Sequence, residues 1–103
     1  LFGKCLKLEE HLFDEDALII ENHQAQRIGL ADADGKVYLE VEFDAPLFGI
    51  WSPVKKHAPF VCIEPWYGRS DREDFDHILE NREWGNELEP GDIFEKDYKI
   101  LVK

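Results

Sequence analysis

Hydrophobic and polar residues alternate along much of this chain with the two-residue period of β-strands. The segment Lys36–Phe43 (KVYLEVEF) shows the pattern best, because every second position from Val37 onward is apolar. Such alternation is typical of an antiparallel strand with one buried face. Immediately before it, Asp32–Gly35 (DADG) ends in an Asp-Gly pair, which favours a tight hairpin turn. We therefore predict a hairpin at this point.

Further strands are predicted on both sides of this turn. Ala17–Glu21 (ALIIE) is short, aliphatic and bounded by charge, and we expect it to pair with the next run, Gln26–Ala31 (QRIGLA). Leu47–Ser52 and Phe60–Ile63 are apolar at nearly every position. Runs of that kind predict central strands that are buried on both faces. The last predicted strand is long and covers Ile93–Val102.

Only Asp71–Glu83 lacks a strand pattern, and its many acidic residues predict a loop or a short helical turn. The remaining pattern has about seven short strands, with turn signals at intervals typical of β-sandwiches. The predicted fold class is therefore all-β, an antiparallel β-sandwich.

Length and composition narrow the range of possible functions. The 103 residues have room for one domain at most, or for part of one, and 44% of them are hydrophobic, which is ample for a core. The chain begins at Leu1 and contains no Met, so we expect a segment of a longer protein. Its net charge of -11 disfavours nucleic acid and anionic membrane surfaces as partners.

Cellular location is predicted from what the chain lacks and from its two cysteines. No stretch approaches the roughly 20 apolar residues of a membrane span, and the first residues have no signal-peptide layout. Cys5 and Cys62 both lie beside or within apolar runs, and two cysteines make no disulfide scaffold. We expect both to be reduced core thiols of a cytoplasmic protein.

A metal site is the first chemistry to consider. Oxygen and nitrogen ligands gather only at Asp71, Asp74, Asp76 and His77, and the twelve-residue calcium-loop pattern is absent. A run of charge is more often a solvated surface. We therefore expect no metal and no cofactor, and the sequence contains no glycine-rich phosphate loop or recognisable nucleophile elbow.

Glu64 is the strongest candidate for chemistry. It follows the apolar run in APFVCIEPWYGRSD (residues 58–71) and precedes Trp66, Tyr67 and Arg69. A carboxylate at the end of an apolar strand, beside a cation, is a candidate general base. The alternative is an ion pair with Arg69 or Arg72 that only pins the loop. The two aromatic residues either stack on the flat C–H face of a sugar or belong to the core or its rim.

Three segments resemble a known family. They are LFDEDALIIEN (residues 12–22), LFGIWSPVKKHAPFVCIEPWYGRSD (residues 47–71) and NELEPGDIFEKDYKI (residues 86–100). Together they resemble the C-terminal part of the aldose 1-epimerase (galactose mutarotase) superfamily, in particular its bacterial galactose-mutarotase-related branch. The resemblance implies that residues 1–103 are the C-terminal segment of one large mutarotase-like β-sandwich, sometimes called a supersandwich.

The resemblance also implies a reaction. The family interconverts the α and β anomers of free aldoses without a cofactor, and its catalytic glutamate matches Glu64. A family aspartate that holds sugar hydroxyls is matched best by Asp16, and we assign Trp66 and Arg69 to substrate binding as well. The family's acid histidine lies in its N-terminal part, and none of the histidines here stands in a comparable motif: His11, His23, His57 and His77.

Other function classes stay open at this point. A carbohydrate-binding protein on the same fold would hold a sugar with Trp66 and Asp16 and would not turn it over. A structural interaction protein would pair its exposed strand edges with another chain. For the enzyme, the expected partners are a monosaccharide of unspecified identity and the missing N-terminal part of the same protein, or a second copy that covers exposed strands.

Overall fold

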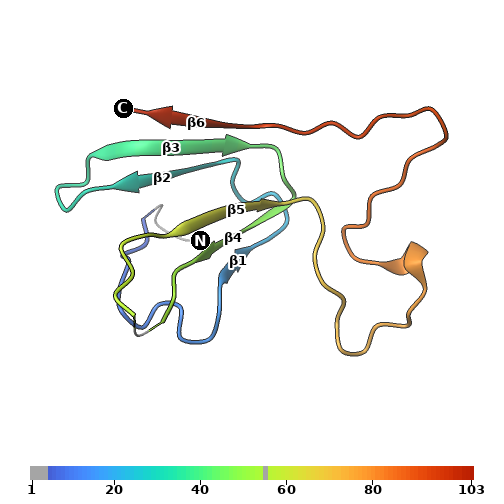
Figure 1. Cartoon of the computed structure of the whole chain (residues 1–103), viewed down its shortest axis with the longest axis horizontal. Coiled ribbons are helices and arrows are strands. Elements are labelled where there is room, and N and C mark those ends of the chain that lie inside the picture. Colours follow the sequence, from blue (N-terminus) through green and yellow to red (C-terminus); the bar gives the residue numbers. More distant parts are fainter. Residues whose placement is uncertain (1–4, 55) are drawn as a thin grey trace.

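The computed structural model describes residues 5–54 and 56–103 of the chain (Figure 1). Six strands and one short 3-10 helix make up the regular structure of these residues. The strands are β1 (Leu18–Ile20), β2 (Arg27–Ala31), β3 (Val37–Phe43), β4 (Leu47–Trp51), β5 (Cys62–Trp66) and β6 (Tyr98–Val102), and the helix is η1 (Leu79–Asn81).

The strands form two antiparallel sheets of three strands each. One sheet has the order β1-β4-β5 and the other the order β2-β3-β6. The prediction of an all-β antiparallel fold is therefore confirmed, as is the absence of strands from residues 71–83 of the described chain. No helix among the described residues is long and apolar enough to cross a membrane.

The hydrophobic core lies between the two sheets. Val41 and Phe43 of β3 face Ile20, Phe48 and other residues of the first sheet, and the rings of Phe43 and Phe48 meet edge to face with centroids 5.0 Å apart. Burying one such side chain contributes about 1.5–3 kcal/mol. The alternation predicted for this strand is confirmed over its second half, whereas Val37 remains exposed near the hairpin.

Two predicted pairings have different outcomes. The hairpin at residues 32–35 is confirmed, because β2 pairs with β3 and Gly35 has a φ of 83°, which glycine adopts without strain. The pairing of β1 with β2 is wrong, because β1 pairs with β4. The chain reverses after β1 through Asn22 and His23, both with positive φ. The His23 amide then donates to the Pro46 carbonyl, so the sequence neighbours enter different sheets.

Strand boundaries in the second half of the chain also differ from the prediction. The strand predicted at residues 60–63 lies further along the chain, because β5 covers Cys62–Trp66. Glu64 therefore lies in the middle of the strand rather than at its end. Strand β4 is central as predicted, but β5 is an edge strand of the described sheet. An edge tolerates Pro65, which has no N–H to donate to a second neighbour.

The last strand and the cysteines bring two smaller corrections. The predicted strand Ile93–Val102 is shortened to β6, because only Tyr98–Val102 finds a partner, namely β3. Residues 67–97 instead form an arm that extends away from the sheets (Figure 1). Both cysteines are free thiols, and Cys62 is half-buried, but Cys5 is exposed instead of lying in the core.

Candidate functional site

Glu64 projects from the face of the β1-β4-β5 sheet that points away from the core. In the strand register, Glu64 lies opposite Gly49, and Gly49 lies opposite Ile19 of β1. The adjacent residues along β4, Phe48 and Ile50, belong to the core. Because side chains alternate between the two faces of a strand, Glu64 and Trp66 share the outer face. We call the surface formed by Ile19, Gly49, Glu64 and Trp66 the Glu64 surface.

The indole of Trp66 lies across the strands and reaches Glu64. Its Nε1–H donates a hydrogen bond of 3.1 Å to Glu64 Oε2. The ring passes directly over Gly49, where an added Cβ would stand only 2.9 Å from Trp66 Cζ2. A glycine in an apolar strand often marks such a close approach. Gly49 therefore provides the space in which the indole can orient the carboxylate.

Among the described residues, the Glu64 carboxylate is held by a neutral donor and not by a cation. The salt bridges among the described residues include none to Glu64. Arg69 instead pairs with Glu21, which directly follows β1, and Arg72 pairs with Glu83. The Arg69 side chain is 21% exposed, so the Arg69–Glu21 pair is partly shielded from water. The alternative in which Glu64 merely pins Arg69 or Arg72 is therefore wrong for this structure.

Asp16 stands apart from Glu64. It precedes β1 by two residues, and β4 separates β1 from β5 in the sheet. Two strand spacings place the β1 and β5 backbones about 10 Å apart. Asp16 has a φ of 96°, outside the range usual for residues with a side chain, and its Oδ1 accepts a 2.7 Å hydrogen bond from the Ala17 amide. Strained backbone of this kind is frequent at functional sites.

The structure thus brings together some of the predicted site residues. Glu64 and Trp66 are in direct contact, Arg69 lies beyond Trp66 and is held by Glu21, and Asp16 lies at the opposite end of β1. Sequence reasoning missed Gly49 and Glu21. Gly49 could have been found, because a glycine inside the apolar run LFGIW indicates a close approach of another group. Glu21 could not, because it is 48 residues away from its partner Arg69.

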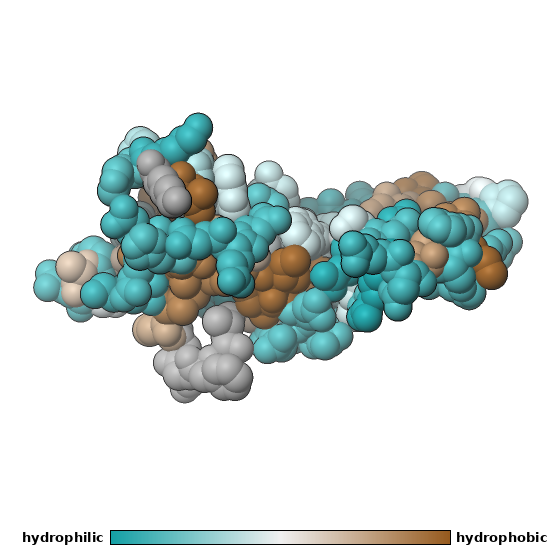
Figure 2. All heavy atoms as spheres, turned by 90° about the horizontal axis from the view of Figure 1, so that it is seen from below, coloured by the Kyte–Doolittle hydropathy of each residue, from teal (hydrophilic) through white to brown (hydrophobic). Residues whose placement is uncertain are grey.

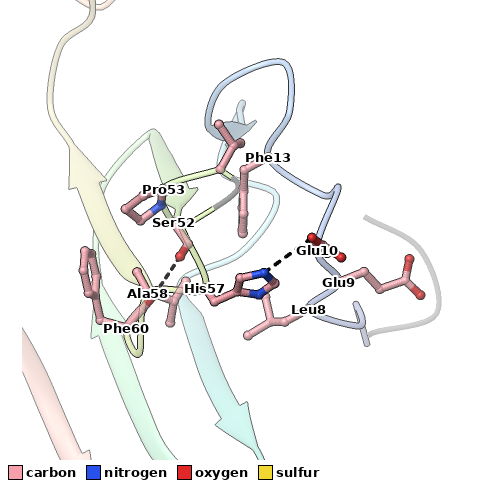
Figure 3. Close-up of a pocket in the computed structure, with 11 residues that line it drawn as sticks. Leu8, Glu9, Glu10, Phe13, Ser52, Pro53, His57, Ala58 and Phe60 are labelled. Carbon is pink, nitrogen blue, oxygen red and sulfur yellow. Dashed lines mark hydrogen bonds and ion pairs between the residues drawn. The ribbon is translucent and has the colours of Figure 1, made fainter.

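One hollow of the described surface lies elsewhere. It is lined by residues 8–10 and 13 and by residues 52–54, 57, 58, 60 and 61, which lie between β4 and β5 (Figure 3). Most of its lining residues are apolar, and His57 Nε2 lies 3.7 Å from Glu10 Oε1, a contact that is an ion pair when the imidazole is protonated. The Ser52 hydroxyl donates to the Phe60 carbonyl at 2.8 Å. Both side chains of this contact are more than half exposed.

The acidic stretch from residue 71 to 77 is organised by hydrogen bonds. The Asp76 carboxylate accepts bonds from the Asn81 side chain and the Ile78 amide, which together lower its pKa. Asp71 accepts from Arg82 at 2.8 Å. No group of three or more potential metal ligands converges among residues 5–54 and 56–103. The stretch is therefore a hydrogen-bonded surface loop in the described structure.

Comparison with known proteins finds curated relatives. The chain is similar to two curated LacX proteins of Lactococcus lactis subsp. lactis, one plasmid-encoded and one chromosomal. It is 31% identical to each over 100 residues, which are 96% of this chain and 33% of each relative. The chain thus spans about a third of the length of these relatives. No family model and no solved structure matches it.

Proposed function

We propose that this chain is the catalytic-base segment of an aldose 1-epimerase with the mutarotase-like supersandwich fold, and that it works in the cytoplasm. The observation that carries the proposal is the Glu64 carboxylate, oriented by Trp66 on an outer sheet face and free of any ion pair among the described residues. A base must present a lone pair to its substrate, and a carboxylate neutralised by arginine would present one poorly.

In the proposed reaction, one Glu64 oxygen accepts the proton of the anomeric hydroxyl of a free hexose. A general acid from outside these residues protonates the ring oxygen, and the C1–O5 bond breaks to give the open aldehyde. Rotation about C1–C2 and reclosure from either side give both anomers, and each proton returns to its donor. Neither a metal nor a cofactor enters this sequence of steps.

Neighbouring residues support binding as well as chemistry. The indole of Trp66 offers a flat apolar surface to the C–H face of a sugar, and its N–H fixes the carboxylate that receives the proton. Asp16 is proposed to hold sugar hydroxyls from the far end of β1. Arg69 is proposed to contact substrate while it remains paired with Glu21.

A second candidate is a carbohydrate-binding protein without turnover. It is favoured by the positions of the histidines, because His23 packs edge to face against Trp84 at 5.9 Å and His57 pairs with Glu10. No described histidine is bonded to Glu64. Under this proposal, Trp66 and Asp16 bind a sugar and the anomers interconvert only at their uncatalysed rate.

Polarimetry separates the two candidates. The longer protein that carries this segment is added to freshly dissolved α-D-galactose or α-D-glucose, and the approach to the equilibrium rotation is followed. An epimerase increases the rate constant in proportion to enzyme concentration, before and after dialysis against EDTA. A rate constant that stays at the buffer value, together with saturable sugar binding, would favour the binding protein.

A further inference from the structure

The chain leaves the first sheet directly after Trp66, the residue that orients Glu64. Trp66 is the last residue of β5 and lies opposite Leu47 of β4 in the register. Within the described sheet, β5 has β4 as its only neighbour, so no strand pairing holds the residues that follow Trp66. The arm, residues 67–97, begins at this point, and its own contacts have to fix the backbone there.

The arm turns back on itself after η1 and returns to its own first residues (Figure 1). The side-chain amide of Asn86 donates a hydrogen bond of 2.6 Å from Nδ2 to the Tyr67 carbonyl oxygen. The guanidinium of Arg82 donates one of 2.8 Å to the Arg69 carbonyl oxygen. Two backbone carbonyls within three residues of Trp66 are thus held by side chains from residues 82–86.

Residues 82–86 are themselves fixed to the end of β1. The ring of Trp84 meets that of His23 edge to face, with centroids 5.9 Å apart. Trp84 also has a φ of 58°, in the left-handed region that residues with a side chain rarely adopt. Such strain persists only where the surrounding structure holds the backbone firmly. Residues 82–86 therefore form a fixed support for the chain that follows Trp66.

Polar contacts rather than apolar packing hold the arm at this support. No residue from 67 to 97, all of which the structure describes, is buried. The face of the arm seen in Figure 2 is mainly hydrophilic. A hydrogen bond that is removed here is therefore not replaced by a hydrophobic core. Of the side-chain bonds from residues 82–86, the one from Asn86 reaches closest along the chain to Trp66.

We propose that Asn86 is a positioning residue for the Glu64 surface. Its amide holds the Tyr67 carbonyl and thereby fixes the backbone directly after Trp66. The Trp66 indole then stays over Gly49, and its N–H reaches the Glu64 carboxylate at 3.1 Å. Asn86 acts through Trp66 and needs no contact with the substrate. The effect of Asn86 on the reaction rate rests on the proposed epimerase, whereas its effect on the Trp66 ring does not.

The test follows the indole N–H signals by NMR in the longer protein that carries this segment, produced with isotope-labelled tryptophan. Trp66→Phe identifies the Trp66 signal by its loss, and Glu64→Ala gives its position without the hydrogen bond. We expect Asn86→Ala to move the signal toward that position. Because a misplacement of about 1 Å can cost about 100-fold in rate, kcat for mutarotation should fall between about tenfold and about 100-fold. Asn86→Asp keeps the size of the side chain but has no N–H to donate at neutral pH, and it should act in the same way.

Asn81→Ala is the matched control. The Asn81 amide also donates a side-chain bond within the arm, 2.8 Å long, but to Asp76 and not to the chain beside Trp66. This variant should leave the Trp66 signal and kcat unchanged, and circular dichroism checks that every variant is folded. An unmoved Trp66 signal in both Asn86 variants, or an equal shift in the control, would overturn the proposal. If the unsubstituted protein has no mutarotase activity, the proposed function fails, and the Trp66 signal still decides the role of Asn86.

Discussion

The Glu64 surface and the hollow beside His57 both place a carboxylate next to a ring, but different backbone holds them. Glu64 and Trp66 belong to β5, which is hydrogen-bonded along its length to β4. Glu10 and His57 come from segments without strand structure, and their ion pair is exposed. Side chains on strands are positioned more precisely than those on loops. The comparison therefore favours the sheet as the place for chemistry.

The largest structural effect is expected from Gly49→Val. The new side chain would meet the Trp66 ring, since even its Cβ would lie 2.9 Å from Cζ2. The ring would have to move and the bond to Glu64 would break. Overpacking of this kind costs about 1–3 kcal/mol, and we expect a lower midpoint in urea unfolding together with reduced activity of the longer protein.

Gly68→Ala is the control for this substitution. Its added Cβ would lie 3.6 Å from the Trp84 carbonyl oxygen, which is an ordinary contact. We expect a change below about 0.5 kcal/mol, as for surface positions in general. Equal losses for the two glycine variants would show that the Trp66 ring is not held over Gly49.

A smaller effect is expected from Arg69→Ala. Arg69 joins the arm to the end of β1 through Glu21, and only 21% of its side chain is exposed. A partly shielded charged hydrogen bond contributes more than an exposed one, so we expect a loss of about 1 kcal/mol. Arg72→Ala, whose side chain is 74% exposed, should change stability by less than about 0.5 kcal/mol.

The coupling between Arg69 and Glu21 can be measured directly. A double-mutant cycle with Arg69→Ala and Glu21→Gln should give a favourable interaction energy, because the two groups pair in the structure. The same cycle between Arg69 and Glu64 should give a value near zero. A larger coupling to Glu64 would contradict the assignment of Arg69 to Glu21.

The smallest effect is expected at the hollow. His57→Ala removes one member of an exposed ion pair, which is worth at most about 1 kcal/mol and often less. We expect stability to change by less than about 0.5 kcal/mol and the mutarotation rate of the longer protein to remain unchanged. A large loss of activity with normal stability would move the site from the sheet to this hollow.

These sites differ in how far the sequence could predict them. Glu64 and Trp66 are two residues apart, and the period of a strand alone places them on one face. Strands β2 and β3 and their hairpin follow from local alternation and an Asp-Gly turn. The pairing of β1 with β4 joins residues about 30 positions apart in the sequence. The turn at Asn22 and His23, which sends β2 to the other sheet, has no comparable local pattern.

Long-range partners explain the remaining errors. Residues 93–97 begin with two apolar residues, Ile93 and Phe94, but pair with no strand of the described chain, so only β6 forms. Arg69 stands five residues from Glu64 in the sequence, which suggested a pair, yet Glu21 reaches it from β1. Packing between distant segments determines these partners, and they cannot be predicted from local patterns in one sequence.

The most direct test of the central claim is the mutarotation rate of Glu64→Gln in the longer protein. The amide keeps the size of the side chain and can still accept the Trp66 hydrogen bond, but it cannot take the anomeric proton. General base catalysis typically contributes about 10²–10⁴-fold, so kcat should fall by that factor, with sugar binding and stability retained. An unchanged kcat per folded molecule would contradict the assignment of Glu64 as the base.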